Sequence, residues 1–200
     1  MNLSEKINSG IWVIYGPNGT GKTSFCIDII NSFEKKVMYL DTKNTLEISR
    51  MKDKLIKNSF IFRVESFKLQ DKMIRELTKM NLKGSIIVID SINHFYRLEK
   101  RDKNNQLSFT FQLKILKELS KNNLVLVIGD VYDVMNSKDF KLYGSSQFDI
   151  KNKVKLNKLE DSKRVAKINE KSYEFEIKKD GINLIKEIKE TNEKLRKTNN

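Results

Sequence analysis

Short apolar runs alternate along the first 130 residues with segments whose apolar positions follow a helical period. The run IWVIY ends at Gly16 and, after a glycine-rich stretch, SFCIDIINSF has helical spacing. This order predicts a strand, a loop and a helix. Further strands are predicted at 36–41, 59–64, 85–90 and 123–130, and further helices at 70–80 and 107–120. Strands that are apolar on both faces and alternate with helices indicate a mostly parallel sheet covered on both sides.

The pattern changes after about Asp133. Three later segments, at 151–160, 164–170 and 173–179, alternate apolar and polar residues and are separated by turn signals. They are predicted to be antiparallel strands that extend the same sheet at one edge. From Leu184 the chain begins with helical periodicity and becomes almost wholly polar, which predicts a frayed helix. We therefore expect one domain over residues 1–185 and a polar tail over 186–200.

The composition is that of a chain with a buried core. Of 200 residues, 38% are hydrophobic and 32% are charged, which excludes a low-complexity or fully disordered chain. No apolar run approaches the roughly 20 residues that cross a bilayer. The N-terminus also lacks the apolar stretch of a signal peptide. These features predict a cytoplasmic protein that has no membrane partner.

The numbers of cysteine, histidine and charged residues limit the kinds of metal site and binding partner that we expect. Cys26 is the one cysteine and His94 the one histidine, so neither a disulfide nor a zinc site of the Cys/His type is expected. Any metal should have oxygen ligands. Lys and Arg number 39 and Asp and Glu 26, which gives a net charge of +13 and predicts attraction to a polyanion such as nucleic acid. An AT-rich genome is an alternative source of the lysine excess.

The strongest chemical signal is GPNGTGKT, which satisfies the pattern G-x-x-x-x-G-K-[ST]. It lies between a predicted strand and a predicted helix, as a phosphate-binding loop must. Backbone N–H groups surround the phosphates, Lys22 reaches the terminal oxygens and Thr23 offers a hydroxyl to Mg²⁺. The predicted cofactors are therefore ATP and Mg²⁺. The predicted nucleotide-binding residues are Gly16, Pro17, Asn18, Gly19, Thr20, Gly21, Lys22, Thr23 and Ser24.

A phosphate-binding loop also requires a carboxylate that holds the magnesium ion through water, at the end of a neighbouring buried strand. Asp90 closes the strongly apolar run SIIVID and fits this place. We predict that Thr23 and Asp90 form the metal site. The alternative is that Asp90 is an ordinary helix N-cap.

Several segments of the sequence resemble those of a known family. VIDSINHFYRLE, at 88–99, resembles the magnesium-binding segment of archaeal RecA-type recombinases, and YLDT, at 39–42, resembles their second core strand. FKLQDKMIREL, the VYD after Gly129 and LYGSSQFDIKNKVKLNKLEDSKRVAKI resemble the RadB branch of that family. The similarity covers about residues 10–185. It implies an α/β fold, a RecA-like P-loop NTPase core with a mostly parallel sheet.

The resemblance also implies a function. It indicates an ATP-binding accessory protein of DNA repair and homologous recombination, which binds DNA, the RadA recombinase or both. Only ten residues precede the first predicted strand, so we expect no N-terminal DNA-binding domain and no filament assembly by this chain alone.

Two residues depart from the family pattern around the phosphates. Lys43 stands where these recombinases carry the glutamate that polarises the attacking water, and Glu47 is a possible substitute base. Because loss of a general base commonly costs about 10²–10⁴ in rate, hydrolysis should be very weak. Asp130 stands where the family has the Asn-Gln pair that senses the γ-phosphate, and it would repel phosphate unless it bonds to a proton, magnesium or a lysine. A contact of Lys43 with the γ-phosphate would offset that charge.

The family's features for DNA contact are also changed. Its double glycine is reduced to Gly144-Ser145-Ser146, and its basic patch is shortened near Glu170. Other basic residues are candidates for sequence-independent contacts to the phosphates of single-stranded DNA. They are Lys151, Lys153 and Lys155 on one strand face, and Arg97 and Arg101 after the magnesium aspartate. The alternative for each cluster is a solvated charged face.

Two other functions remain open. An active RecA-fold ATPase of the KaiC-like signalling type, in which another carboxylate is the base, would turn over strongly without DNA. A small-molecule P-loop kinase would need an arginine-rich lid, and no such segment is visible in the sequence.

Overall fold

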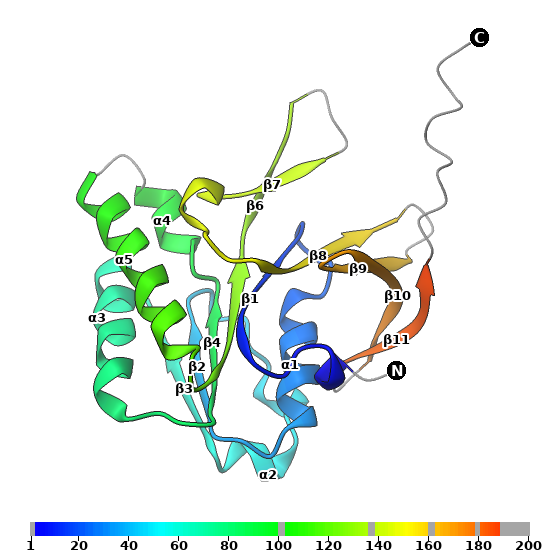
Figure 1. The fold of residues 1–200 in the computed structure, drawn as a ribbon, viewed down its shortest axis with the longest axis horizontal. Coiled ribbons are helices and arrows are strands. Elements are labelled where there is room, and N and C mark those ends of the chain that lie inside the picture. The colour runs from blue at the N-terminus through cyan, green and yellow to red at the C-terminus, as the bar shows by residue number, and fades with distance from the viewer. Residues whose placement is uncertain (1–2, 100–102, 136–138, 160–162, 179–180, 189–200) are drawn as a thin grey trace.

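The computed structural model describes residues 3–99, 103–135, 139–159, 163–178 and 181–188 (Figure 1). The strands are β1 (Gly10–Tyr15), β2 (Val37–Asp41), β3 (Ser59–Arg63), β4 (Ile86–Asp90), β5 (Leu124–Gly129), β6 (Val131–Asp133), β7 (Phe140–Leu142), β8 (Asn152–Lys158), β9 (Arg164–Ile168), β10 (Lys171–Lys178) and β11 (Gly181–Ile188). The α-helices are α1 (Lys22–Ser32), α2 (Asp53–Ile56), α3 (Phe67–Leu77), α4 (His94–Glu99) and α5 (Lys103–Leu119). Short 3₁₀ turns are η1 (Leu3–Glu5), η2 (Ile48–Arg50), η3 (Thr78–Met80) and η4 (Ser145–Gln147).

The nine-stranded sheet has the order β11-β10-β9-β8-β1-β5-β4-β2-β3. From β3 to β8 all neighbouring strands are parallel, so their carboxyl ends meet at one edge. The register places Asp41 opposite Asp90 and Asp90 opposite Ile128. The loops that carry the predicted phosphate and magnesium residues therefore begin side by side.

Helices cover both faces of the parallel strands, as the apolar runs predicted. Strands β2, β4 and β5 are buried along their whole length. Figure 1 shows α1 and α2 on one face of the sheet and α3, α4 and α5 on the other, and two hydrophobic clusters match these layers. Among the residues that the structure describes, no helix is both long enough and apolar enough to cross a membrane.

The later strands extend the sheet beyond β1, as predicted. β8 pairs parallel with β1, and β9, β10 and β11 then follow in antiparallel order. Side chains alternate between the two faces of β8: Val154 and Leu156 are buried in the cluster that contains α1 residues, while Lys153 and Lys155 point to the other face. β11 lies against α1, where Gly181 leaves less than 3 Å between an added Cβ and Asp28.

Several parts of the chain differ from the sequence-based expectations, and the helix expected at 70–80 is α3, Phe67–Leu77. The helix expected from Leu107 begins one turn earlier, at Lys103. The helix expected from Leu184 is wrong, because β11 continues as a strand through Ile188 and pairs with β10. Residues 189–200 of the predicted tail lie outside the described residues. The antiparallel pair β6 and β7 was not foreseen, and Figure 1 shows it projecting from the carboxyl edge of the sheet.

Candidate functional site

The phosphate-binding loop connects β1 to α1 and has a cavity of about 440 Å³ beside it. The Lys22 Nζ donates hydrogen bonds to the carbonyl oxygens of Gly16 and Pro17, at 2.7 and 3.0 Å. Burial lowers the pKa of Lys22, and the nearby Lys43 charge adds to this effect. The cavity is lined by Asn18, Gly19, Gly21, Lys22, Thr23, Ser24, Lys43, Thr45, Arg50, Asp90 and Ile177.

Two glycines of the loop are required by close neighbours. A Cβ on Gly16 would lie 2.3 Å from the backbone oxygen of Leu156 in β8. Gly21 has φ +97°, a left-handed conformation, and its added Cβ would meet Ile177 of β10 at 2.8 Å. The antiparallel extension therefore forms one wall of the loop.

Thr23 and Asp90, predicted to form the metal site, are brought together by the structure. The Thr23 Oγ1 and the Tyr39 hydroxyl each donate a hydrogen bond of 2.8 Å to the Asp90 Oδ2. Burial raises the pKa of Asp90, and these two hydrogen bonds oppose that shift. A hydroxyl and a carboxylate oxygen suit Mg²⁺, which takes few protein ligands and retains waters and phosphate oxygens. Among the described residues no cluster of three His, Cys, Asp or Glu forms a complete protein cage.

Lys43 and Asp130, the two departures from the family pattern, form an ion pair. The Lys43 Nζ donates to the Asp130 Oδ1 at 2.5 Å. Burial alone would raise the pKa of Asp130, but the hydrogen bond and positive charge of Lys43 outweigh it and lower that pKa. The sequence predicts that Asp130 repels phosphate unless it bonds to a proton, magnesium or a lysine. In the structure its bonding partner is a lysine, Lys43.

The loop that carries Lys43 is shaped by Asp41. The Asp41 carboxylate accepts hydrogen bonds from the backbone N–H groups of Lys43, Thr45 and Leu46, at 3.1, 3.3 and 3.0 Å. Such side-chain bonds to the following backbone are typical of aspartate in turns. Glu47, the possible substitute base, follows this turn, is exposed, and is not among the described residues that line the cavity.

Arg50 is a cavity residue that sequence reasoning missed. Its guanidinium donates to the Ser24 Oγ at 2.8 Å and to the Lys178 backbone oxygen at 3.3 Å. Arg50 thus joins η2 to the phosphate-binding loop and to the end of β10. No local signal marks it, because both partners are distant in the sequence.

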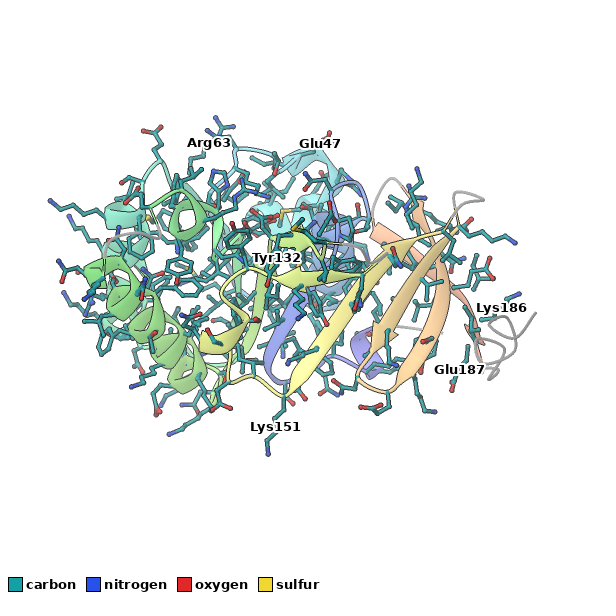
Figure 2. All side chains as sticks on the ribbon, turned by 90° about the horizontal axis from the view of Figure 1, so that it is seen from above. Glu47, Arg63, Tyr132, Lys151, Lys186 and Glu187 are labelled. Carbon is teal, nitrogen blue, oxygen red and sulfur yellow. The ribbon has the colours of Figure 1, made fainter. Side chains whose placement is uncertain are left out.

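The three lysines predicted on one strand face do share a face. Lys151, Lys153 and Lys155 line a second cavity, of about 530 Å³, together with Tyr15, Asn152, Lys167, Asn169 and Glu170. Lys155 pairs with Asp139 at 2.6 Å. Seen from above, in Figure 2, Lys151 projects on the side of the molecule opposite Glu47. Arg97 lies on α4 and does not line this cavity, and Arg101 lies outside the described residues.

A third cavity is lined by tyrosines and was also missed. It has a volume of about 420 Å³ and lies between α4, the β6/β7 pair and η4. The rings of Tyr132 and Tyr143 meet edge to face with centroids 5.2 Å apart. Tyr132 is 42% exposed and lies near the centre of the view in Figure 2. The residues that line it are Tyr96, Tyr132, Tyr143, Gly144, Ser145, Ser146 and Gln147.

Comparison with known proteins agrees with this geometry. Residues 12–156 match the model of the ATPase family associated with various cellular activities. A DNA repair and recombination protein RadB of Methanocaldococcus jannaschii is 35% identical, over 86% of this chain and 92% of its own. RadB proteins of Methanococcus maripaludis and Thermococcus sibiricus are each 31% identical, over 92% and 94% of this chain and 97% and 92% of theirs.

A solved structure supports the fold. The crystal structure of the RadB recombinase superposes with a TM-score of 0.76 at 22% identity, over 92% of this chain and 97% of that one. The expected RecA-like P-loop core, mostly parallel with antiparallel strands at one edge, is thereby confirmed. The relatives are more than 30% identical along nearly their whole length, which shows the family as well as the fold: the chain belongs to the RadB family.

Proposed function

We propose that this protein is an ATP- and Mg²⁺-binding accessory of DNA repair and homologous recombination that works as a nucleotide-dependent binding switch. The observation that carries the proposal is the intact phosphate-binding loop with Thr23 hydrogen-bonded to Asp90. Membership of the RadB family supports the recombination role, because the relatives carry that description.

The loop and its cavity support ATP binding. Backbone N–H groups of the loop and Lys22 would hold the phosphates. Thr23 would hold Mg²⁺ through its hydroxyl, and Asp90 would hold the ion through a water molecule. The bound ion would neutralise phosphate charge. Lys22 already points its ammonium at loop carbonyls, so it has to exchange those acceptors for phosphate oxygens.

The lining of the same cavity supports weak hydrolysis. Among its described lining residues Asp90 is the one carboxylate, and Asp90 is engaged by Thr23 and Tyr39. Lys43, at the place of the family's glutamate, donates to Asp130 in an ion pair and offers no carboxylate that could accept a proton from water. We therefore infer that the nucleotide mainly changes the binding state of the protein.

DNA is the proposed polyanion. The cavity lined by Lys151, Lys153 and Lys155, the lysine cavity, suits backbone phosphates. The cavity lined by Tyr96, Tyr132 and Tyr143, the tyrosine cavity, suits unpaired bases, since single strands commonly bind by stacking their bases on aromatic rings. The β6/β7 pair contacts residues of both cavities, because the Lys155 ammonium lies over the Phe140 ring and Tyr132 packs edge to face against Tyr143. We propose sequence-independent binding of single-stranded DNA in the cytoplasm and, from the family resemblance, the RadA recombinase as protein partner.

The test is ATP binding and single-turnover hydrolysis on one preparation, with and without single-stranded DNA, and with Lys22→Ala as the control. Tight, Lys22-dependent binding with negligible turnover supports the switch. Strong turnover without DNA contradicts it and favours the KaiC-like signalling ATPase. DNA binding that does not respond to ATP contradicts the nucleotide-dependent part.

A further inference from the structure

The Lys43–Asp130 pair joins two loops at the carboxyl edge of the sheet. Lys43 follows β2, and Asp130 follows β5. The two strands are separated by β4, so only the tertiary fold brings the residues together. Both of them stand where the resemblance expects other residue types, and the structure makes them partners.

Asp130 is the fixed member of the pair. Its backbone N–H donates to the Asn93 Oδ1 at 2.7 Å, and its carbonyl accepts from the Asn93 Nδ2 at 3.0 Å. Its second carboxylate oxygen accepts from the Ser91 Oγ at 3.2 Å. The Asp130 side chain is 5% exposed and that of Lys43 22%. The carboxylate thus stays in place while the longer lysine has room to turn.

Lys43 also faces the nucleotide cavity, which it lines with Lys22, Thr23 and Asp90. Lys22 and Asp130 lie within electrostatic reach of each other, since Lys22 helps to lower the pKa of Asp130. A terminal phosphoryl group held by Lys22 would therefore enter the field of the Asp130 carboxylate. An ammonium has three donors, so Lys43 can keep one on Asp130 and direct another at a phosphate oxygen.

We propose that Lys43, oriented by Asp130, bridges that carboxylate and the terminal phosphoryl group of a bound nucleoside triphosphate. Lys43 is then the residue that distinguishes triphosphate from diphosphate. A diphosphate lacks the terminal group and gains nothing from Lys43. The inference rests on the proposed nucleotide binding at the phosphate-binding loop.

The experiment compares two probes, ADP and the non-hydrolysable β,γ-imido analogue of ATP, in equilibrium binding with Mg²⁺ at fixed ionic strength. Lys43→Gln should weaken binding of the analogue about tenfold or more, because it removes a charge-assisted hydrogen bond and exposes phosphate to Asp130. ADP affinity should change less than about twofold, a much smaller change in binding free energy than the tenfold loss expected for the analogue. ADP binding also reports that the variant is folded.

A second substitution tests the role of Asp130. In the Lys43→Gln background, Asp130→Asn removes the unneutralised carboxylate and should recover part of the lost affinity for the analogue. The matched control is Lys72→Gln, an exposed lysine of α3 with the same change of charge, which should alter neither affinity.

The outcomes separate the two proposals. Equal effects of Lys43→Gln on both probes, or no effect on the analogue, overturn the assignment of Lys43. Failure of Asp130→Asn to recover affinity overturns the bridge. Absence of Lys22-dependent binding of ADP by the unaltered protein overturns the proposed function itself.

Discussion

At the scale of single residues, the two departures from the family pattern at the phosphate site neutralise each other's charge. The resemblance implies a glutamate and a neutral glutamine at these positions, with a net charge of −1, whereas Lys43 and Asp130 form an ion pair whose charges cancel. A lysine alone would leave an uncompensated positive charge beside Lys22, and an aspartate alone would repel phosphate. Each substitution is tolerable because the other accompanies it.

This reciprocity predicts that the family's arrangement has to be restored at both positions together. Lys43→Glu with Asp130→Gln should raise the single-turnover rate of ATP hydrolysis, by about a hundredfold if the glutamate acts as a general base. Lys43→Glu alone places two carboxylates in contact, which should destabilise the fold. The control is Lys43→Gln with Asp130→Gln, which has no new base. A double variant that binds ATP but gains no turnover would mean that the missing base is not what limits hydrolysis.

At the scale of elements, the phosphate-binding loop depends on a strand that is far along the chain. β8 runs parallel to β1, and its Leu156 carbonyl occupies the space beside Gly16. Because backbone in a paired strand cannot retreat, a side chain at Gly16 has to displace the loop or the strand. Gly19 has φ +74° but no heavy atom within 4 Å of its added Cβ.

The two glycines therefore make a matched pair for a stability measurement. Gly19→Ala should lose about 1–2 kcal/mol in the free energy of unfolding, the usual cost of a left-handed conformation. Gly16→Ala should lose about 1–3 kcal/mol more, because it adds steric overlap to its own backbone strain. Urea unfolding without nucleotide measures both. Equal losses would contradict the close approach of β8.

At the scale of the whole molecule, the positive charge is not spread evenly around the sites. The lysine cavity is lined by Lys151, Lys153, Lys155 and Lys167, whereas the described lining of the tyrosine cavity includes no basic residue. The cavity beside the phosphate-binding loop lies at the start of α1. The alternation of β8 turns Lys153 away from the buried Val154 and Leu156, and both Lys153 and the preceding Lys151 are exposed. A chain whose lysines only reflected genome composition would bind DNA equally through any face.

Salt dependence distinguishes these cases. Lys151→Gln with Lys153→Gln should weaken binding of single-stranded DNA and reduce the slope of log K against log salt by about 0.7 for each lost phosphate contact. The control is Lys68→Gln with Lys72→Gln, exposed lysines of α3 with the same change of charge. Equal effects of the two double variants would favour general attraction over a binding face.

Interior positions were largely predictable from the sequence, and positions at element ends were not. Phe109 and Phe111 cannot share a helix face, and Phe109 is buried while Phe111 is 45% exposed. The apolar positions of residues 184–188 fit a helical period and predict a helix. In the structure these residues form a strand instead, because they pair with β10. Pairing with a neighbouring strand outweighs weak local preference.

The sequence by itself determined the parallel core, the phosphate-binding loop and the place of Asp90 at the end of a buried strand, since these depend on local spacing and on where a buried strand ends. Tertiary structure decided the rest of the site. It joined Lys43 to Asp130, brought Arg50 to Ser24, and gathered three tyrosines around one cavity. The physical reason is the same in each case: the partners come from separate elements, and their distance is set by strand order, which no local pattern encodes.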